Sequence, residues 1–135
     1  MKRCLVSVAM VCWLAVAGCA ASRVEGPAGP QVLHVVLLQF KPEVPADQQA
    51  RALEQSIARL RAIPGVRAVE AGPKVRDDRP IHIRDYHGAI LVRLTDESAL
   101  DGYGPHPLHQ AFLQEFQPLF ASVRVIDFAA LPPTP

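Results

Sequence analysis

The chain has 135 residues, half of them hydrophobic, with 14 basic and 13 acidic side chains. Lys2 and Arg3 are two of the basic ones and lie in a segment that we expect to be removed, so 12 basic side chains remain against 13 acidic ones. Charges of both signs are interleaved and form no basic stripe, which excludes nucleic acid from the predicted partners.

An export signal is predicted at the N-terminus. Lys2 and Arg3 precede an apolar run over residues 5–17, and this run ends in small residues. A helix that crosses a bilayer needs about 20 apolar residues. The run is shorter than that, so we interpret it as a signal that is cleaved.

Residues 16–19, with the sequence VAGC, resemble the lipobox of bacterial lipoproteins. The resemblance implies that residues 1–18 are a signal peptide and that Cys19 is lipidated and becomes the mature N-terminus. Ala20, rather than an aspartate, follows the cysteine. This implies a place in the cell envelope, on the periplasmic side of the outer membrane if the host has two membranes. The alternative is an ordinary signal peptide with a cysteine there by chance.

Cysteine use in the mature chain follows from this assignment. Cys4 and Cys12 leave with the signal peptide and Cys19 carries the lipid, so no free thiol is expected to remain. We therefore expect neither a disulfide framework, nor a cysteine nucleophile, nor a thiolate metal site.

The mature chain is predicted to form a single domain. Residues 19–30 are small and rich in proline and glycine, so we interpret them, with the lipidated cysteine, as a flexible tether. Residues 129–135 are predicted to be an irregular tail. The segment between them, residues 31–128, has about 100 residues, which suits one small domain.

Hydrophobic periodicity places the elements along this domain. Apolar and β-branched runs predict strands, spacings of three and four predict helices, and a polar loop is expected at 73–85. The predicted strands are 31–40, 66–72, 86–94 and 122–128, and the predicted helices are 46–60, a short one from 96 and 106–120.

The order β-α-β-β-α-β predicts an α+β, ferredoxin-like fold with one antiparallel sheet and helices on one face. The first and third strands look apolar on both faces, although helices can cover only one. We therefore expect the open face to pack against a second subunit, which would make the protein a homodimer.

Five segments in this order, HVVLLQFKPEV, IPGVRAVEAGPKV, YHGAILVRL, YGPHPLHQAF and VRVIDF, resemble the stress-responsive dimeric α/β-barrel (Dabb) family. The resemblance runs over about residues 33–128. It implies a ferredoxin-like protomer that dimerises face to face into an α/β barrel, with a pocket between sheet and helices.

The family includes the plant olivetolic acid cyclase, in which a tyrosine and a histidine of a Y-x-x-H-P-x-H stretch take part in an aldol cyclisation. The matching residues here are Tyr103 and His109, which the resemblance marks as candidate catalytic residues. His34 and His87 match strand histidines of that cyclase. An exported protein would scarcely meet a polyketide thioester, so we do not expect the cyclase reaction itself.

The stretch YGPHPLH contains both candidates. Pro107 suits the first position of a helix, where its missing N–H would be unpaired in any case, so His106 is the expected cap and His109 the third helical residue. The helix dipole and partial burial both disfavour a charged His109. A neutral imidazole accepts a proton, and Tyr103 can donate a hydrogen bond to a developing oxyanion. Capping and packing alone would also explain the stretch.

Three further histidines are candidate ligand-binding residues: His34, His87 and His106. His34 stands on an otherwise aliphatic strand face, from which it could hydrogen-bond His109 and set its tautomer. The competing interpretation is a core histidine without a functional role. The spacing of His106 and His109 also permits a zinc pair, but the usual zinc-binding spacings are missing and we expect no metal. No residue pattern encodes a cofactor either.

Three functions remain open. The first is an envelope lipoprotein that binds a small hydrophobic or phenolic molecule in a pocket lined by histidine and tyrosine. The second is an enzyme with proton-transfer or aldol/lyase-like chemistry, with His109 as base and Tyr103 as hydrogen-bond donor. The third is a structural envelope dimer in stress tolerance.

Overall fold

The computed structural model describes residues 30–131. The predicted signal peptide, the lipidation site Cys19 and nearly all of the predicted tether lie outside the described residues, as does the end of the predicted tail. No helix within residues 30–131 is long and apolar enough to cross a membrane.

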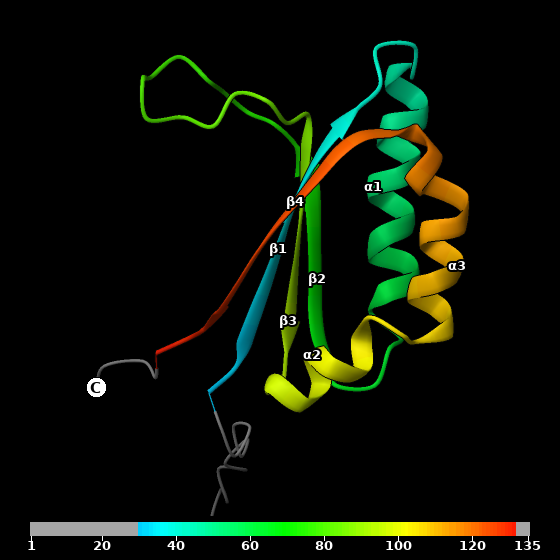
Figure 1. Ribbon diagram of the computed structural model, residues 1–135, viewed down its shortest axis with the longest axis vertical. Coiled ribbons are helices and arrows are strands. Elements are labelled where there is room, and N and C mark those ends of the chain that lie inside the picture. The colour runs from blue at the N-terminus through cyan, green and yellow to red at the C-terminus, as the bar shows by residue number, and fades with distance from the viewer. Residues whose placement is uncertain (1–29, 132–135) are drawn as a thin grey trace, which may run out of the picture.

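The described chain forms one sheet with helices on one of its faces (Figure 1). Its elements follow the predicted ferredoxin-like order, including the predicted short helix after the third strand. They are β1 (Val32–Phe40), α1 (Ala46–Leu60), β2 (Val66–Pro73), β3 (Gly88–Leu94), α2 (Glu97–Tyr103), α3 (Pro107–Phe116), a 3₁₀ turn (Gln117–Leu119) and β4 (Phe120–Ala129).

The element ends lie within two residues of the prediction except at the end of α3. α3 ends at Phe116 rather than at residue 120, because Pro118 has no N–H to donate back along the helix and the chain tightens into a 3₁₀ turn there. β4 continues to Ala129, one residue into the segment predicted to be irregular. The Ala130 N–H, just after the strand, donates to the Gln31 carbonyl.

The sheet has the strand order β2-β3-β1-β4, and all neighbouring strands are antiparallel. β1 and β3 are central, whereas β2 and β4 form the edges. Strand alternation turns Leu38, Val92 and Leu94 toward the helices, where each is at most 1% exposed. Burial of such aliphatic side chains contributes roughly 1.5–3 kcal/mol each, so this helix-facing side is the core of the domain.

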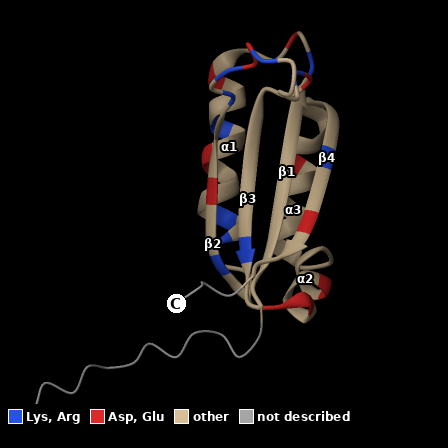
Figure 2. Ribbon diagram, turned by 90° about the vertical axis from the view of Figure 1, so that its left-hand side faces the viewer, with Lys and Arg blue, Asp and Glu red and all other residues tan. Residues whose placement is uncertain are grey.

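The other face of the sheet, here called the open face, carries no helix. Figure 2 views the molecule from this side, and most of the strand surface in it carries no charge. Val35 lies here, directly opposite Leu91 on one side and Ile126 on the other. Ile126 and Phe128 are about half exposed. The prediction that this face is apolar is confirmed.

Candidate functional site

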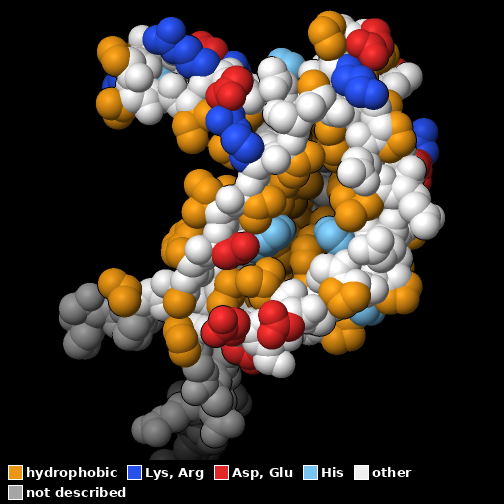
Figure 3. All heavy atoms as spheres, in the orientation of Figure 1, with side chains coloured by type: hydrophobic (Ala, Val, Ile, Leu, Met, Phe, Trp, Pro, Cys, Tyr) orange, Lys and Arg blue, Asp and Glu red, His pale blue; other side chains and the backbone are white. Residues whose placement is uncertain are grey.

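A cavity of about 300 Å³ lies between the sheet and helices α2 and α3. Figure 3 shows it as a hollow with hydrophobic walls and histidine side chains on both sides. Aliphatic and aromatic side chains make up most of the wall, among them Val36, Leu38, Ile90, Phe112 and Leu113. The titratable side chains that line it are His34, Tyr103 and His109.

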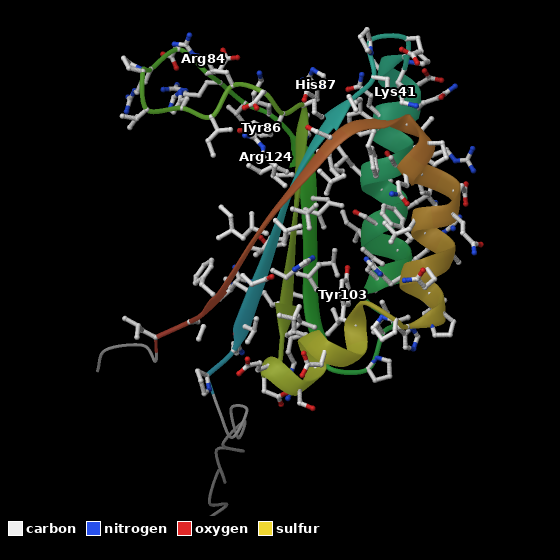
Figure 4. The ribbon with its side chains drawn as sticks, in the orientation of Figure 1. Lys41, Arg84, Tyr86, His87, Tyr103 and Arg124 are labelled. Atoms are coloured by element: carbon white, nitrogen blue, oxygen red, sulfur yellow. The ribbon has the colours of Figure 1, made fainter. Side chains whose placement is uncertain are left out.

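Tyr103 is the last residue of α2 and is 3% exposed. Its ring packs between two imidazoles, with centroid distances of 5.4 Å to His34 and 4.6 Å to His109. In Figure 4 it lies between the sheet and the helices. Burial raises the pKa of the phenol well above its ordinary value. Tyr103 therefore keeps its proton at physiological pH and acts as a hydrogen-bond donor.

The Tyr103 hydroxyl has no hydrogen-bond partner within residues 30–131. No fully buried polar side-chain atom of the described chain is unsatisfied. Tyr103 lines the cavity, and its hydroxyl keeps its hydrogen-bonding capacity. The site therefore offers one donor to a ligand.

His109 is the third residue of α3, as predicted from Pro107. Its Nδ1 lies 2.9 Å from the Gly104 carbonyl oxygen. A carbonyl only accepts, so Nδ1 carries the proton and Nε2 is the unprotonated acceptor. Burial lowers the pKa of His109, the Gly104 carbonyl opposes this, and nearby His34 lowers it further. Burial therefore shifts the pKa of His109 in the predicted direction, toward the neutral imidazole, and the backbone sets its tautomer.

His34 lines the cavity from β1, but its hydrogen-bond partner differs from the predicted one. Its Nδ1 lies 2.6 Å from Oδ1 of Asp127, and not against His109. The two residues are direct partners in the pairing of β1 with β4. A carboxylate accepts, so Nδ1 of His34 carries the proton, and Asp127 fixes the ring beside Tyr103.

Sequence reasoning missed Asp127. Alternation along VRVIDF places it on the same strand face as Val123 and Val125, which line the cavity. That signal was visible in the sequence. Its register against His34 was not, because that register depends on which strands pair and where.

His106 caps α3 as predicted, with its Nδ1 accepting from the Leu108 N–H at 3.2 Å. The structure does not bring it to the polar end of the cavity. It instead borders a separate surface groove beside Gly65 and Asp96. The expectation that His106 helps to build the polar end of the pocket is therefore corrected, because the cap turns its ring toward the helix backbone.

His87 also lies away from the cavity. Figure 4 shows His87 and Tyr103 at opposite ends of the sheet. The His87 Nδ1 accepts from the Phe40 N–H at 2.9 Å, and its ring stacks on that of Phe40 at a centroid distance of 6.3 Å. Its predicted place among the ligand-binding histidines is corrected, since the ring nitrogen already satisfies the backbone where the β1–β4 register shifts.

A metal centre has no ligand set in the described part of the chain. Within residues 30–131, no group of three or more histidine, cysteine, aspartate or glutamate side chains is arranged to hold an ion. His34 and His109 each have one ring nitrogen engaged in a protein hydrogen bond. The arrangement offers a donor and an acceptor beside an apolar cavity, which suits binding or proton transfer.

Comparisons with known proteins agree with the fold. A family model, the stress responsive A/B barrel domain (Dabb), matches residues 32–130. A Dabb-family protein with a ferredoxin-like fold from Mesorhizobium loti is 27% identical, with a TM-score of 0.62 over 76% of this chain and 99% of that one. A comparison with curated proteins finds no match.

Two further structures share the architecture. A dimeric ferredoxin-like protein of unknown function from Thermobifida fusca is 23% identical, with a TM-score of 0.65 over 76% of this chain and 93% of that one. A hydroxynitrile lyase from Passiflora edulis is 15% identical, with a TM-score of 0.66 over 79% of this chain and 99% of that one. At these identities the likeness concerns the fold alone.

Proposed function

The chain belongs to the stress responsive A/B barrel domain family, and from this premise we propose that it binds a small, largely apolar molecule in the cavity between sheet and helices. The observation that carries the proposal is the make-up of that cavity. Its walls are apolar, while Tyr103 supplies a free donor and His109 an acceptor nitrogen. A ligand hydroxyl can accept from the first and donate to the second at the same time.

The size of the cavity narrows the class of ligand. A cavity of about 150 Å³ holds one benzene molecule, and this one measures about 300 Å³. A single ring with a short alkyl substituent therefore fits. A phenol provides the hydroxyl as well, so we propose a hydrophobic phenol or a similar hydroxyl-bearing molecule as the ligand.

The test compares matched compounds by thermal denaturation of the purified protein. Short-chain alkylphenols should raise the melting temperature in proportion to the logarithm of their concentration. Alkylbenzenes of the same size should raise it less, because they leave the polar groups unpaired. Tyr103→Phe should remove most of the difference between the two compound classes. If no compound of either class stabilises the protein, the binding proposal fails.

A proton-transfer enzyme is the second candidate, favoured by the fixed tautomer of His109 beside the Tyr103 ring. Nε2 of His109 would take a proton from the substrate, and Tyr103 would donate a hydrogen bond to the oxyanion that develops. The lyase from Passiflora edulis shares the fold, so hydroxynitriles belong in the substrate panel. Release of cyanide by the wild type and its loss in His109→Ala would support this candidate, and an inactive wild type would contradict it.

A homodimer is proposed for the assembly. The related structure from Thermobifida fusca is described as dimeric, and the open face here carries half-exposed Ile126 and Phe128. Burial of that face in a second copy removes apolar surface from water. A dimer that binds no compound of the panel would instead support a structural role in the envelope.

We propose further that Cys19 anchors the domain in the cell envelope through a covalent lipid. The lipobox-like residues 16–19 support this assignment. Metabolic labelling with an alkyne-bearing fatty acid should mark the wild type in its membrane fraction. Cys19→Ala should abolish both the label and the membrane association, whereas retention of the label would contradict the proposal.

A further inference from the structure

The loop that joins β2 to β3, residues 74–87, projects from the sheet on the side of the open face (Figure 1). We call it the arm. It carries three exposed aliphatic side chains, Val75, Ile81 and Ile83, of which the first two are 92% and 85% exposed. Single exposed aliphatic residues are ordinary, but three on one loop are typical of an interaction surface.

Hydrogen bonds and ion pairs hold the arm in place. Nη2 of Arg124, on β4, donates to Oδ1 of Asp85 at 2.5 Å and to the Asp85 carbonyl at 3.1 Å. The Lys74 ammonium donates to Asp77 at 2.7 Å and to the Arg84 carbonyl at 3.1 Å. In Figure 4, Arg84 lies on the arm, with Arg124 at its base. These bonds therefore fix the conformation of the arm and its position relative to the sheet.

A groove of about 390 Å³ lies between the arm and the open face. All three aliphatic side chains of the arm line it from one side, and Leu37 and Ala89 line it from the sheet. Leu37 and Ala89 are direct partners in the pairing of β1 with β3. Leu37 shares its strand face with Val35, which lies opposite Ile126. The arm and the open face thus form one concavity, with aliphatic side chains on both walls and Lys74, Arg76 and His82 along the arm, and Figure 3 shows it as a notch below the arm.

We propose that the arm clasps a second copy of this chain, with Val75, Ile81 and Ile83 packed against the partner subunit. This inference rests on the homodimer proposed above. A partner sheet packed on the open face would lie about 10 Å from the first sheet, on the side to which the arm projects. A partner subunit that covers Ile126 and Phe128 would therefore also lie next to the groove.

The charges of the arm favour a protein partner over a lipid surface. Residues 74–87 contain four basic and three acidic side chains. Loops that dock on anionic membranes carry a clear basic excess around their apolar residues. Mixed charge around an apolar centre is instead typical of the polar rim of a protein interface.

The experiment measures dimer dissociation of the full chain, purified in mild detergent, by analytical ultracentrifugation. The double variant Val75→Asp/Ile81→Asp should raise the dissociation constant about tenfold or more, because two charges would be buried against the partner. Leu108→Asp is the matched control, since it makes the same kind of change on α3, away from the open face. It should leave the dissociation constant unchanged.

The outcomes separate the arm from the dimer itself. If the arm variant dimerises as the wild type does, the role of the arm is overturned while the homodimer stands. If the wild type is a monomer, both are overturned. In that case, loss of binding to anionic phosphatidylglycerol vesicles in the arm variant would assign the arm to a membrane surface.

A second measurement does not depend on a destabilising charge. The photo-crosslinking residue benzoylphenylalanine, placed at position 81 in intact cells, should give a covalent adduct of twice the mass of the chain. Digestion should map the adduct to a peptide of the same chain. An adduct with a different protein, or no adduct of doubled mass, would overturn the proposal.

Discussion

The two ends of the sheet carry the same kinds of side chain and use them differently. At one end, the His87 ring stacks on Phe40, and its Nδ1 accepts a hydrogen bond from the Phe40 backbone N–H. At the other end, the His109 ring packs against Tyr103 at a tilt of 43° and uses only its Nδ1 in a protein hydrogen bond, and both residues line the cavity. Residue type alone therefore does not separate a structural histidine from a candidate functional one. What separates them is whether the ring nitrogen that could reach a ligand already accepts a hydrogen bond from the protein.

The largest effect is expected from substitution of His109, which lines the cavity. His109→Ala should reduce the stabilisation by alkylphenols at least to the level given by alkylbenzenes, because the ligand hydroxyl loses its acceptor in an apolar site. The unliganded protein should lose only about 1 kcal/mol of unfolding free energy, since the Gly104 carbonyl keeps its bond from Gln110 Nε2 at 2.7 Å. Thermal denaturation with and without ligand gives both quantities. An undiminished ligand response would remove His109 from the site.

The opposite pattern is expected at the other end. His87→Ala leaves the Phe40 N–H without its acceptor and should lower the unfolding free energy by about 1–3 kcal/mol. The response to alkylphenol should stay as in the wild type, because His87 does not line the cavity. Urea denaturation measures the first effect. A lost ligand response at unchanged stability would contradict the structural assignment of His87.

The pH dependence of binding sharpens the comparison. Burial holds the pKa of His109 below its usual value of 6.5, so Nε2 remains an acceptor from pH 8 down past 6.5. Affinity for alkylphenol should be flat over that range and then fall up to about tenfold per pH unit below the pKa of the folded protein.

The contribution of His109 to stability should follow the same course. It is fully present above pH 6.5 and is lost as the pH falls through the lower pKa of the folded state, because the unfolded chain then binds more protons. Isothermal titration calorimetry between pH 4.5 and 8 measures the affinity. His109→Gln is the control and should show no such fall, so a fall of equal size in that variant would assign the titration to another group.

The smallest effect is expected from the edge of the cavity. Asp127→Asn weakens the partner of His34 Nδ1, but the carboxylate is 42% exposed, so the loss should be about 0.5–1 kcal/mol of binding free energy. Asp85→Asn, on the arm, is the matched control and should leave ligand affinity unchanged. Equal effects of both substitutions would indicate a general loss of charge rather than a role for Asp127.

Much of the fold was predictable because its signals are local. Alternation and helical spacing placed all four strands and the two long helices, and Pro107 fixed both His106 as a cap and His109 as the third residue of α3. The helix end at Phe116 was also signalled, by Pro118, but was overlooked. These features depend on residues a few positions apart.

The site was only partly predictable because its geometry depends on distant pairings. Both His34 and His109 were expected near Tyr103, and the structure brings the three together. The partner of His34 required the register of β4, and the exclusion of His87 required knowing that its ring is held by Phe40. A single sequence shows neither the strand register nor the surroundings of His87 in the fold.

The pairing of β1 with β4 has a consequence for how the protein is made. His34 and Asp127 are 93 positions apart, and β4 is the last strand of the domain. Such distant contacts form late, because the intervening chain must close first. While the ribosome still holds the C-terminal residues, the nascent polypeptide lacks the cavity wall that β4 provides. A chain released before β4 is translated would therefore be unable to bind ligand. The domain can complete its fold only after its last strand has left the ribosome.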